Sequence, residues 1–542
     1  MKETLLATAV GFATVMSEAL AADPATALGL VPIPKEISFS RQKTPNALML
    51  DANTRILYDA KSAGACEAAE FLVSFMVEDA GLKLTSAPAP AKQSHDKNIV
   101  FRAKTGMPTE GYELRTGPGV TIEASGGAGF FYGAQTLRQM LTRDAATGKP
   151  AIPVGITIMD EPRFAWRGLM IDCCRHFFTV EELKKMLDLM ASLKLNTFHW
   201  HLTEDQAWRI EIKKYPKLTE IGAWRGGVGF DLPSTSTDRY RADGKYGGFY
   251  TQEQAKEIIK YAAARHINVT PEIEMPGHST AALVVYPEFG CTGGPYAMPA
   301  GGGIFLDVYC AGNDKTIAFL EDVLTEIADL FPSKFVHIGG DECPKDRWTS
   351  CAKCQQRIRA NGLKDEKELQ SWFVRRMDKF LESKGKRLIG WDEILEGGLA
   401  PGAAVMSWRG VKGGIEAASA GHDVVMSPTT HCYFDYLQAK TGEPVGIGGF
   451  LPLEKVYEFD PVTTGIPEAK RQHVLGGQAN VWTEHIPNAR KLQYMTAPRV
   501  CALAEAVWSP ADKRNWADFR ARMDREAARL DAMGINYRKL DK

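Results

Sequence analysis

The chain has 542 residues, 44% of them hydrophobic, and its 65 basic and 66 acidic side chains give a formal net charge of −1. This composition fits a globular protein with a sizeable core and a length suited to two or more domains. No block of like charges stands out, so nucleic acid or a membrane surface is a poor candidate for a partner.

The first residues have the outline of a secretory signal. An apolar run over 5–16 follows Lys2, and the sequence ALA at 19–21 offers a small-residue cleavage site. We therefore expect a leader over 1–21 and an exported, periplasmic or secreted, mature chain; an ordinary N-terminal helix is the alternative. No later stretch approaches the roughly 18 uninterrupted apolar residues typical of a membrane span.

Residues 22–160 mix short strand-like runs with helical stretches. Strand patterns occur at 98–102, 112–116 and 120–123, and helical patterns occur at 65–79 and 129–141. We expect an N-terminal α+β domain here. Because none of its polar residues has a catalytic spacing, we expect this domain to be non-catalytic.

Between residues 161 and 510 strands alternate with helices, which is typical of a parallel sheet with helical crossovers. The strand candidates are 166–172, 197–202, 267–273, 335–338, 387–391, 404–408, 423–427 and 474–479. Eight such units predict a (β/α)8 TIM barrel, with its active site at the carboxyl ends of the strands. Residues 511–542 carry an apolar stripe at helical spacing, so we expect a C-terminal helix packed on the barrel.

The fourth strand candidate runs into the sequence FVHIGGDE at 335–342. Gly339 and Gly340 let the backbone turn, and Asp341 and Glu342 then stand side by side at the carboxyl end of the strand. Neighbouring strand residues point to opposite faces, so we expect the two acids to have different roles. Taken alone, such a pair is more simply a solvated turn.

The other strand ends change this interpretation, because they too carry carboxylates and aromatic side chains. Flat aromatic faces stack on pyranose rings while carboxylates and arginine bind hydroxyl groups, so this set suits a sugar site. The sequence lacks a phosphate loop, a dinucleotide fingerprint and a nucleophile elbow. His199 and His201 share one strand face without a clear carboxylate triad, so we predict no catalytic metal.

Ten cysteines are too few for a disulfide scaffold. In an exported chain Cys291 and Cys310 could pair across a loop rich in Gly and Pro. Cys343, Cys351 and Cys354 include a CxxC pair, but no second pair lies nearby, so we favour a disulfide or plain thiols over a metal there. The pairing of the ten cysteines stays open.

Six motifs in chain order are recognisable: WRGLMIDCCRHF, FHWHLTEDQAWRIEI, EMPGH, HIGGDE, GWDEIL and NVWTE. Together they closely resemble family 20 of the glycoside hydrolases, the β-N-acetylhexosaminidases, over about residues 31–510. The resemblance implies exo-hydrolysis of non-reducing terminal GlcNAc or GalNAc from glycans or chitooligosaccharides. It also implies a retaining mechanism in which the substrate's acetamido group is the nucleophile and forms an oxazolinium ion, with no metal and no cofactor.

The resemblance also assigns roles to the residues. Glu342 is expected to be the general acid and base, Asp341 to orient the acetamido group, and Tyr433 to donate to its carbonyl oxygen. The indole positions are Trp372, Trp391 and Trp482, and the hydroxyl-binding positions are Arg167, Asp435 and Glu484. Trp408 either lines the pocket or packs below it.

His278 is expected to support Glu342, with His201 nearby. Many family members carry two aspartates where this chain has Glu204 and Asp205, so the partner of His278 stays open. A narrower specificity, for a disaccharide or a sulfated sugar, is an alternative that loops 226–248 and 290–303 would decide. A glycan-binding protein without catalysis is disfavoured because both Asp341 and Glu342 are present. The sequence does not indicate linkage preference or oligomeric state.

Overall fold

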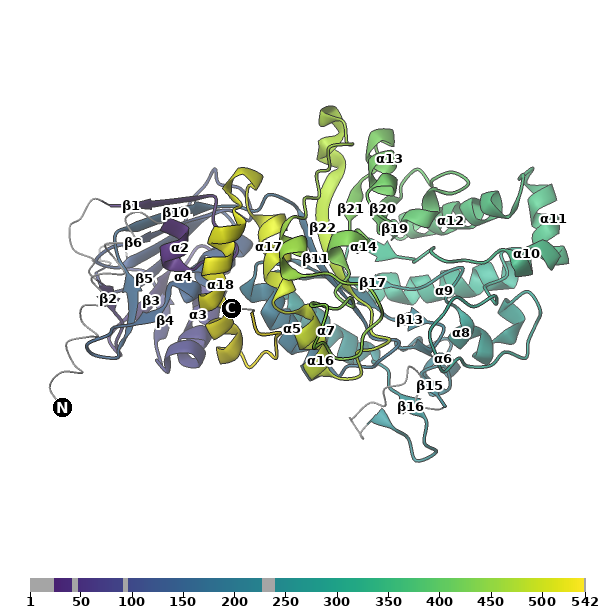
Figure 1. The fold of residues 1–542 in the computed structure, drawn as a ribbon, viewed down its shortest axis with the longest axis horizontal. Coiled ribbons are helices and arrows are strands. Elements are labelled where there is room, and N and C mark those ends of the chain that lie inside the picture. The colour runs from purple at the N-terminus through teal and green to yellow at the C-terminus, as the bar shows by residue number, and fades with distance from the viewer. Residues whose placement is uncertain (1–23, 41–46, 91–95, 227–238, 541–542) are drawn as a thin grey trace. The chain divides into compact units, whose positions relative to one another are not determined.

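A computed structural model describes residues 24–40, 47–90, 96–226 and 239–540, which form two compact units (Figure 1). The first unit takes in the described residues up to Arg163, together with 192–194 and 504–535. The remaining described residues form the second unit. The leader expected over 1–21 lies outside the described residues and stays a prediction.

The first unit is built on a mixed sheet of seven strands in the order β1-β10-β6-β7-β5-β3-β4. These strands are β1 (Glu36–Phe39), β3 (Arg55–Tyr58), β4 (Thr85–Pro88), β5 (Ile99–Ala103), β6 (Tyr112–Thr116), β7 (Val120–Ala124) and β10 (Ile156–Asp160). Helices α3 (Ala63–Ala80) and α4 (Gly127–Met140) pack on each other and on this sheet. A small sheet joins β2 (Ala47–Met49), β9 (Pro150–Pro153) and β8 (Thr142–Arg143). The predicted α+β domain is confirmed.

The C-terminal helix α18 (Trp516–Ala532) is part of the first unit, and the expectation that it packs on the barrel stays a prediction. It contacts α2 (Pro24–Leu28). Its fully buried Arg522 places Nη1 and Nη2 each 2.7 Å from the carboxylate of Glu505, near the end of α17 (Arg499–Trp508). A buried guanidinium needs such a partner. An apolar stripe predicts a buried helix face without identifying what covers it.

The second unit contains a closed barrel of eight parallel strands, so the predicted TIM barrel is confirmed. In order around the barrel they are β11 (Trp166–Asp172), β12 (Thr197–His201), β17 (Asn268–Glu272), β18 (Phe335–His337), β19 (Arg387–Trp391), β20 (Ala404–Ser407), β21 (Val424–Met426) and β22 (Val474–Val481). Figure 1 labels six of them, β11, β17, β19, β20, β21 and β22.

Helices follow most barrel strands. The longer ones are α5 (Val180–Ser192), α7 (Gln252–Ala263), α9 (Asp314–Leu330), α12 (Glu366–Ser383), α13 (Lys412–Ala420), α16 (Ala489–Thr496) and α17. Short elements in the loops include β13 (Thr203–Glu204), β14 (Ala207–Trp208), α6 (Lys217–Glu220), β15 (Trp224–Arg225), β16 (Tyr246–Gly247), α8 (Thr280–Val285), η2 (Pro287–Phe289), α10 (Asp346–Ser350), α11 (Ala352–Ala360), η3 (Asp392–Leu395), α14 (Thr429–Cys432), α15 (Leu453–Tyr457), η4 (Glu468–His473) and η5 (Ala511–Lys513). None of the helices that the structure describes combines the length and apolar character needed to cross a bilayer.

Local sequence explains how helix α5 begins. Thr179 Oγ1 accepts from the backbone N–H of Glu182, and the Glu182 carboxylate accepts from the N–H of Thr179, so the capping box before α5 is complete. Leu183, Leu187 and Met190 then lie on one buried face of α5. The helix therefore starts where polar side chains satisfy its first N–H groups, and it is retained by burial of its apolar face.

Candidate active site

The segment after β18 requires glycine and bends sharply. Gly339 and Gly340 have φ of 67° and 93°. A Cβ at Gly339 would lie 1.6 Å from Oε2 of Glu274, so only glycine fits there. Glu342 itself has a φ of 40°, a conformation that side chains rarely adopt and that concentrates at functional sites.

This bend brings the two acids together. Oδ2 of Asp341 and Oε2 of Glu342 each lie 3.6 Å from Nε2 of His278. The opposite orientations expected of strand neighbours do not occur, because residues 341 and 342 lie past the end of the strand. Burial distinguishes the pair instead: the Asp341 side chain is 10% exposed and the Glu342 side chain 35%. Burial, opposed by the nearby charge of His278, raises the pKa of Asp341 to about 6.

His278 follows β17, also with a positive φ, of 46°. Its Nδ1 lies 2.7 Å from Oε1 of Glu204 and 3.1 Å from Oδ2 of Asp205, so both acids are its partners. The other oxygen of Asp205 accepts from the backbone N–H and the hydroxyl of Thr280. Burial would lower the pKa of His278, but the surrounding carboxylates, Glu204 foremost, raise it well above its usual value. The imidazole is therefore a cation that faces the acid pair.

A buried network on the neighbouring strands supports Glu204. His201 places Nε2 3.3 Å from Glu204 and Nδ1 2.5 Å from Glu272. Glu272 also lies 3.0 Å from Nε2 of His199 and 2.8 Å from Nδ1 of His337. Burial would raise the pKa of Glu272, yet these imidazoles hold it well below its usual range. The carboxylate partner of the paired histidines, which the sequence did not reveal, thus comes from the adjacent strand.

The arginine at this end of the barrel is Arg175, not Arg167. Arg167 is the second residue of β11, is fully buried, and donates through Nη1 to the carbonyl of Phe164 at the opposite end of the strand. Arg175 follows the carboxyl end of β11, with guanidinium nitrogens 2.9 Å from Glu204 and 3.8 Å from Glu484. The motif WRGLMIDCCRHF holds both arginines, and the seven-residue length of β11 separates their ends of the barrel.

The structure also changes part of the expected set of aromatic site residues. Trp391 and Trp482 have ring centroids 5.8 Å apart, and Trp408 stacks with Tyr433 at 6.0 Å. Trp408 also donates through Nε1 to Glu393, which follows β19 at the same end of the barrel. Trp372 lies apart, on α12, where the guanidinium of Arg357 covers its ring at 4.6 Å.

Asp435 follows Tyr433 along the chain and lies close to Trp482 and Glu484. Burial, together with the neighbouring Glu484, raises the pKa of Asp435 well above its usual value. Burial also raises the pKa of Glu484, against the charge of Arg175. Among the described residues Asp341 Oδ1, Asp435 Oδ1 and Glu484 Oε2 are buried oxygens without a hydrogen-bond partner. Buried acceptors of this kind require donors, which a ligand rich in hydroxyl and amide groups would supply.

The arrangement therefore offers one half-exposed acid, one buried acid beside an imidazolium, an indole and phenol wall, and unmatched acceptors. The groups with metal-like spacing near this end of the barrel include two histidine–carboxylate sets, namely His199, Glu272 and His337, and Glu204, Asp205 and His278. In both sets the imidazoles lie close enough to the carboxylates to pair with them. Their chemistry is that of buried histidine–carboxylate pairs, which orient one another.

Comparison with known proteins gives the same result. The family model for the catalytic domain of glycosyl hydrolase family 20 matches residues 164–511, and that for domain 2 of the same family matches residues 27–161. A β-hexosaminidase of Porphyromonas gingivalis is 51% identical over 449 residues, which cover 81% of this chain and 56% of that protein. The match thus spans little more than half the length of this relative.

Solved structures agree with the sequence match. An N-acetyl-β-hexosaminidase of Streptomyces plicatus, in complex with thio-NAglucal, superposes with a TM-score of 0.81 at 32% identity, covering 95% of this chain and 97% of that chain. A family 20 exo-β-N-acetylglucosaminidase of Vibrio harveyi, in complex with N-acetylglucosamine, has a TM-score of 0.83 at 33% identity, covering 94% and 78%.

Proposed function

The chain belongs to glycosyl hydrolase family 20, and on that basis we propose that it is an exo-acting, retaining β-N-acetylhexosaminidase. The substrates would be glycans or chitooligosaccharides that end in non-reducing GlcNAc or GalNAc. One observation carries the proposal: Asp341 and Glu342 converge on the His278 imidazolium beside buried acceptors that have no partner. The names of the relatives from Porphyromonas, Streptomyces and Vibrio support the same activity.

In the proposed mechanism the substrate supplies the nucleophile. Its 2-acetamido carbonyl oxygen attacks the anomeric carbon while Glu342 protonates the departing glycosidic oxygen. Asp341 accepts the acetamido N–H and stabilises the positive charge of the oxazolinium ion. Glu342 then removes a proton from water, and this water attacks the anomeric carbon and opens the oxazolinium ring. The sugar therefore leaves with its anomeric configuration retained.

The burial of the two acids suits this division. Glu342 is the more exposed acid, where a leaving group and then water can reach it, whereas Asp341 is enclosed with His278. Asp341 must be ionised to accept the acetamido N–H. The His278 cation favours that form against the raised pKa that burial imposes. His278 is thus a positioning residue that keeps Asp341 charged.

The aromatic and polar side chains near the acid pair would hold the sugar ring. Trp391, Trp408 and Trp482 would enclose the acetamido methyl and the apolar ring face, and Tyr433 would donate to the acetamido oxygen. Arg175, Asp435 and Glu484 would bind the remaining hydroxyl groups, because they lie next to Trp482 and include two of the unmatched acceptors. This arrangement fits the exo mode, since these side chains would hold a single terminal sugar unit.

The test compares aryl β-N-acetylglucosaminide with aryl β-glucoside under identical conditions. Hydrolysis of the first alone is expected, and equal rates on both would refute acetamido participation. Asp341→Asn is expected to impair turnover, whereas rescue by azide with a glycosyl azide product would indicate an ordinary carboxylate nucleophile. A panel with GalNAc, chitobiose, sulfated GlcNAc and N-glycan termini then separates the broad specificity from the narrower alternative.

We also propose that the mature protein is exported, on the leader-like pattern at 1–21. Expression of the full chain with fractionation and N-terminal sequencing tests this. A product that begins after residue 21 outside the cytoplasm is expected, and an intact N-terminus in the cytoplasm would refute it.

A further inference from the structure

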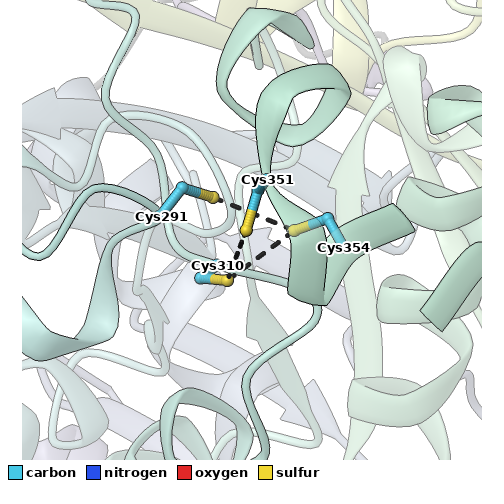
Figure 2. Close-up of side chains that lie close together, drawn as sticks. All are labelled: Cys291, Cys310, Cys351 and Cys354. Carbon is cyan, nitrogen blue, oxygen red and sulfur yellow. Dashed lines mark hydrogen bonds between the residues drawn. The ribbon is translucent and has the colours of Figure 1, made fainter. Parts of the chain in front are cut away.

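Four cysteines from separate segments converge beside the barrel (Figure 2). Cys291 follows η2, Cys310 precedes α9, and Cys351 and Cys354 lie at the start of α11. The sulfur of Cys310 is 3.7 Å from that of Cys351 and 3.6 Å from that of Cys354, and Cys291 Sγ is 3.8 Å from Cys354 Sγ. All four sulfurs lie within 4.8 Å of one another.

These distances match a tetrahedron around one metal ion. Zinc–thiolate bonds of about 2.3 Å place neighbouring sulfurs of a tetrahedral site about 3.8 Å apart. A disulfide would bring two sulfurs to about 2.05 Å, and none of the ten cysteines is paired in this way. Four sulfurs that are mutually close, with none bonded, fit a shared central ion better than two separate bridges.

The surroundings favour thiolates. Cys351 is the N-cap residue of α11 and Cys354 lies in its first turn, where the partial positive charge of a helix N-terminus stabilises anionic sulfur. Cys310, Cys351 and Cys354 are buried and Cys291 is partly exposed, so the site is closed but can be reached from one side. A closed set of four protein ligands is the pattern of a structural zinc site.

The backbone also fits this convergence. A Cβ on Gly312 would lie 2.2 Å from the carbonyl carbon of Lys353 and 2.3 Å from the backbone nitrogen of Cys354. Only glycine therefore lets the segment after Cys310 approach the start of α11 so closely. Cys310 donates its N–H to the carbonyl of Phe289, which ties it to the segment that carries Cys291.

The sequence pointed to part of this group. It singled out Cys343, Cys351 and Cys354, whereas folding groups the CxxC pair of Cys351 and Cys354 with Cys291 and Cys310. Cys343 Sγ is instead directed at the carbonyl of Pro344. The spacing of Cys291 and Cys310 suggested a bridge between them, and their shared proximity to Cys354 appears only after folding.

We propose that Cys291, Cys310, Cys351 and Cys354 bind one Zn²⁺ ion as a structural site. The thiols lose their protons as the four zinc–sulfur bonds form. The ion would join the loop before α9 to the start of α11. The first of these segments follows His278 and the second follows Glu342 along the chain, so the site would stabilise both loops that carry the acid pair and its imidazole.

The test starts with the unmodified full chain, which removes any dependence on variants. After dialysis against metal-free buffer we expect about one zinc per chain by mass spectrometry of the metal. Replacement by Co²⁺ should give the thiolate-to-cobalt absorption and visible bands of a tetrahedral sulfur site. Metal-free protein with two disulfides, found by peptide mapping without reduction, would overturn the proposal.

Variants then locate the ion. Cys351→Ser combined with Cys354→Ser should abolish zinc retention and the cobalt bands, and lower the thermal midpoint. The matched control is Cys432→Ser, which alters another buried cysteine and should keep the full metal content. Zinc that persists in the double variant would overturn the assignment to these cysteines.

Discussion

His278→Asn gives the sharpest test of how the acid pair is charged. Nε2 of His278 lies 3.6 Å from Oδ2 of Asp341, and both side chains are almost fully buried. Asparagine removes the cation and accepts the positive φ of 46° at this position more readily than most side chains. The substitution thus changes charge while it preserves the backbone turn.

The distance between His278 and Asp341 sets the size of the expected change in the pKa of Asp341. Unit charges 3.6 Å apart interact by about 4–5 kcal/mol at an effective dielectric constant of about 20. At about 1.36 kcal/mol per pKa unit this limits the change in pKa to about three units, and ion pairs of this kind commonly change it by about 1–3. The pKa of Asp341, about 6 with His278 present, should therefore rise to about 7–9 in the variant.

The direction of the shift in the pH profile depends on which protonation state of Asp341 is active. Asp341 acts as a carboxylate, so kcat/KM falls as the pH drops through its pKa. The acid limb of the profile should lie near 6 in the unmodified protein and move upward in His278→Asn. At pH 7 the ionised fraction alone would then lower kcat/KM by about 2-fold to 100-fold.

The assay is the pH profile of kcat/KM for an aryl β-N-acetylglucosaminide. His422→Gln is the control, since its ring contacts the carbonyl of Ala403 away from the acid pair, and its profile should match that of the unmodified protein. An acid limb of His278→Asn that stays in place or moves to lower pH would refute the electrostatic role of the imidazolium.

Further predictions concern single side chains. Glu342→Gln should lower turnover by ~10²–10⁴-fold on substrates with poor leaving groups and much less on a dinitrophenyl glycoside, and equal losses on both would remove its role as acid. Arg175→Lys should lower kcat/KM by about 10–100-fold, because the single ammonium group of lysine cannot reproduce the planar guanidinium that reaches Glu204 and Glu484 together; an unchanged value would exclude it from the sugar site. Trp408→Ala should lower kcat/KM by about tenfold or more while Trp372→Ala leaves it unchanged, and the reverse ranking would restore the indole assignment that the structure corrects. Arg522→Leu should destabilise the first unit by about 3–5 kcal/mol in denaturant unfolding, since it leaves a buried carboxylate unpaired; a loss below about 1 kcal/mol would contradict the buried ion pair.

Local pattern was enough for the fold because each barrel strand is a short apolar run bounded by turn residues. The turn before the acid pair was also readable, since Gly339 and Gly340 precede it, but the pair was recognised as a site only from the other strand ends and the family motifs. Two site assignments that the structure corrects have different causes. Arg167 lies at the start of the strand predicted at 166–172, so the rule that barrel sites lie at the carboxyl ends of strands already disfavoured it. For Trp372, the sequence does not reveal which side of its helix faces the site.

The sequence by itself thus predicted the barrel and the position of Asp341 and Glu342 at the end of its fourth strand, because these depend on short-range periodicity and turn chemistry. The roles of the two acids came from the resemblance to a known family. Only the tertiary structure showed that Arg175 pairs with Glu204, that Trp408 stacks on Tyr433, and that both Glu204 and Asp205 contact His278. It also brought Cys291 and Cys310 to the CxxC pair. These contacts join residues far apart in the chain, and their distances are set by how strands and loops pack, which no local pattern encodes.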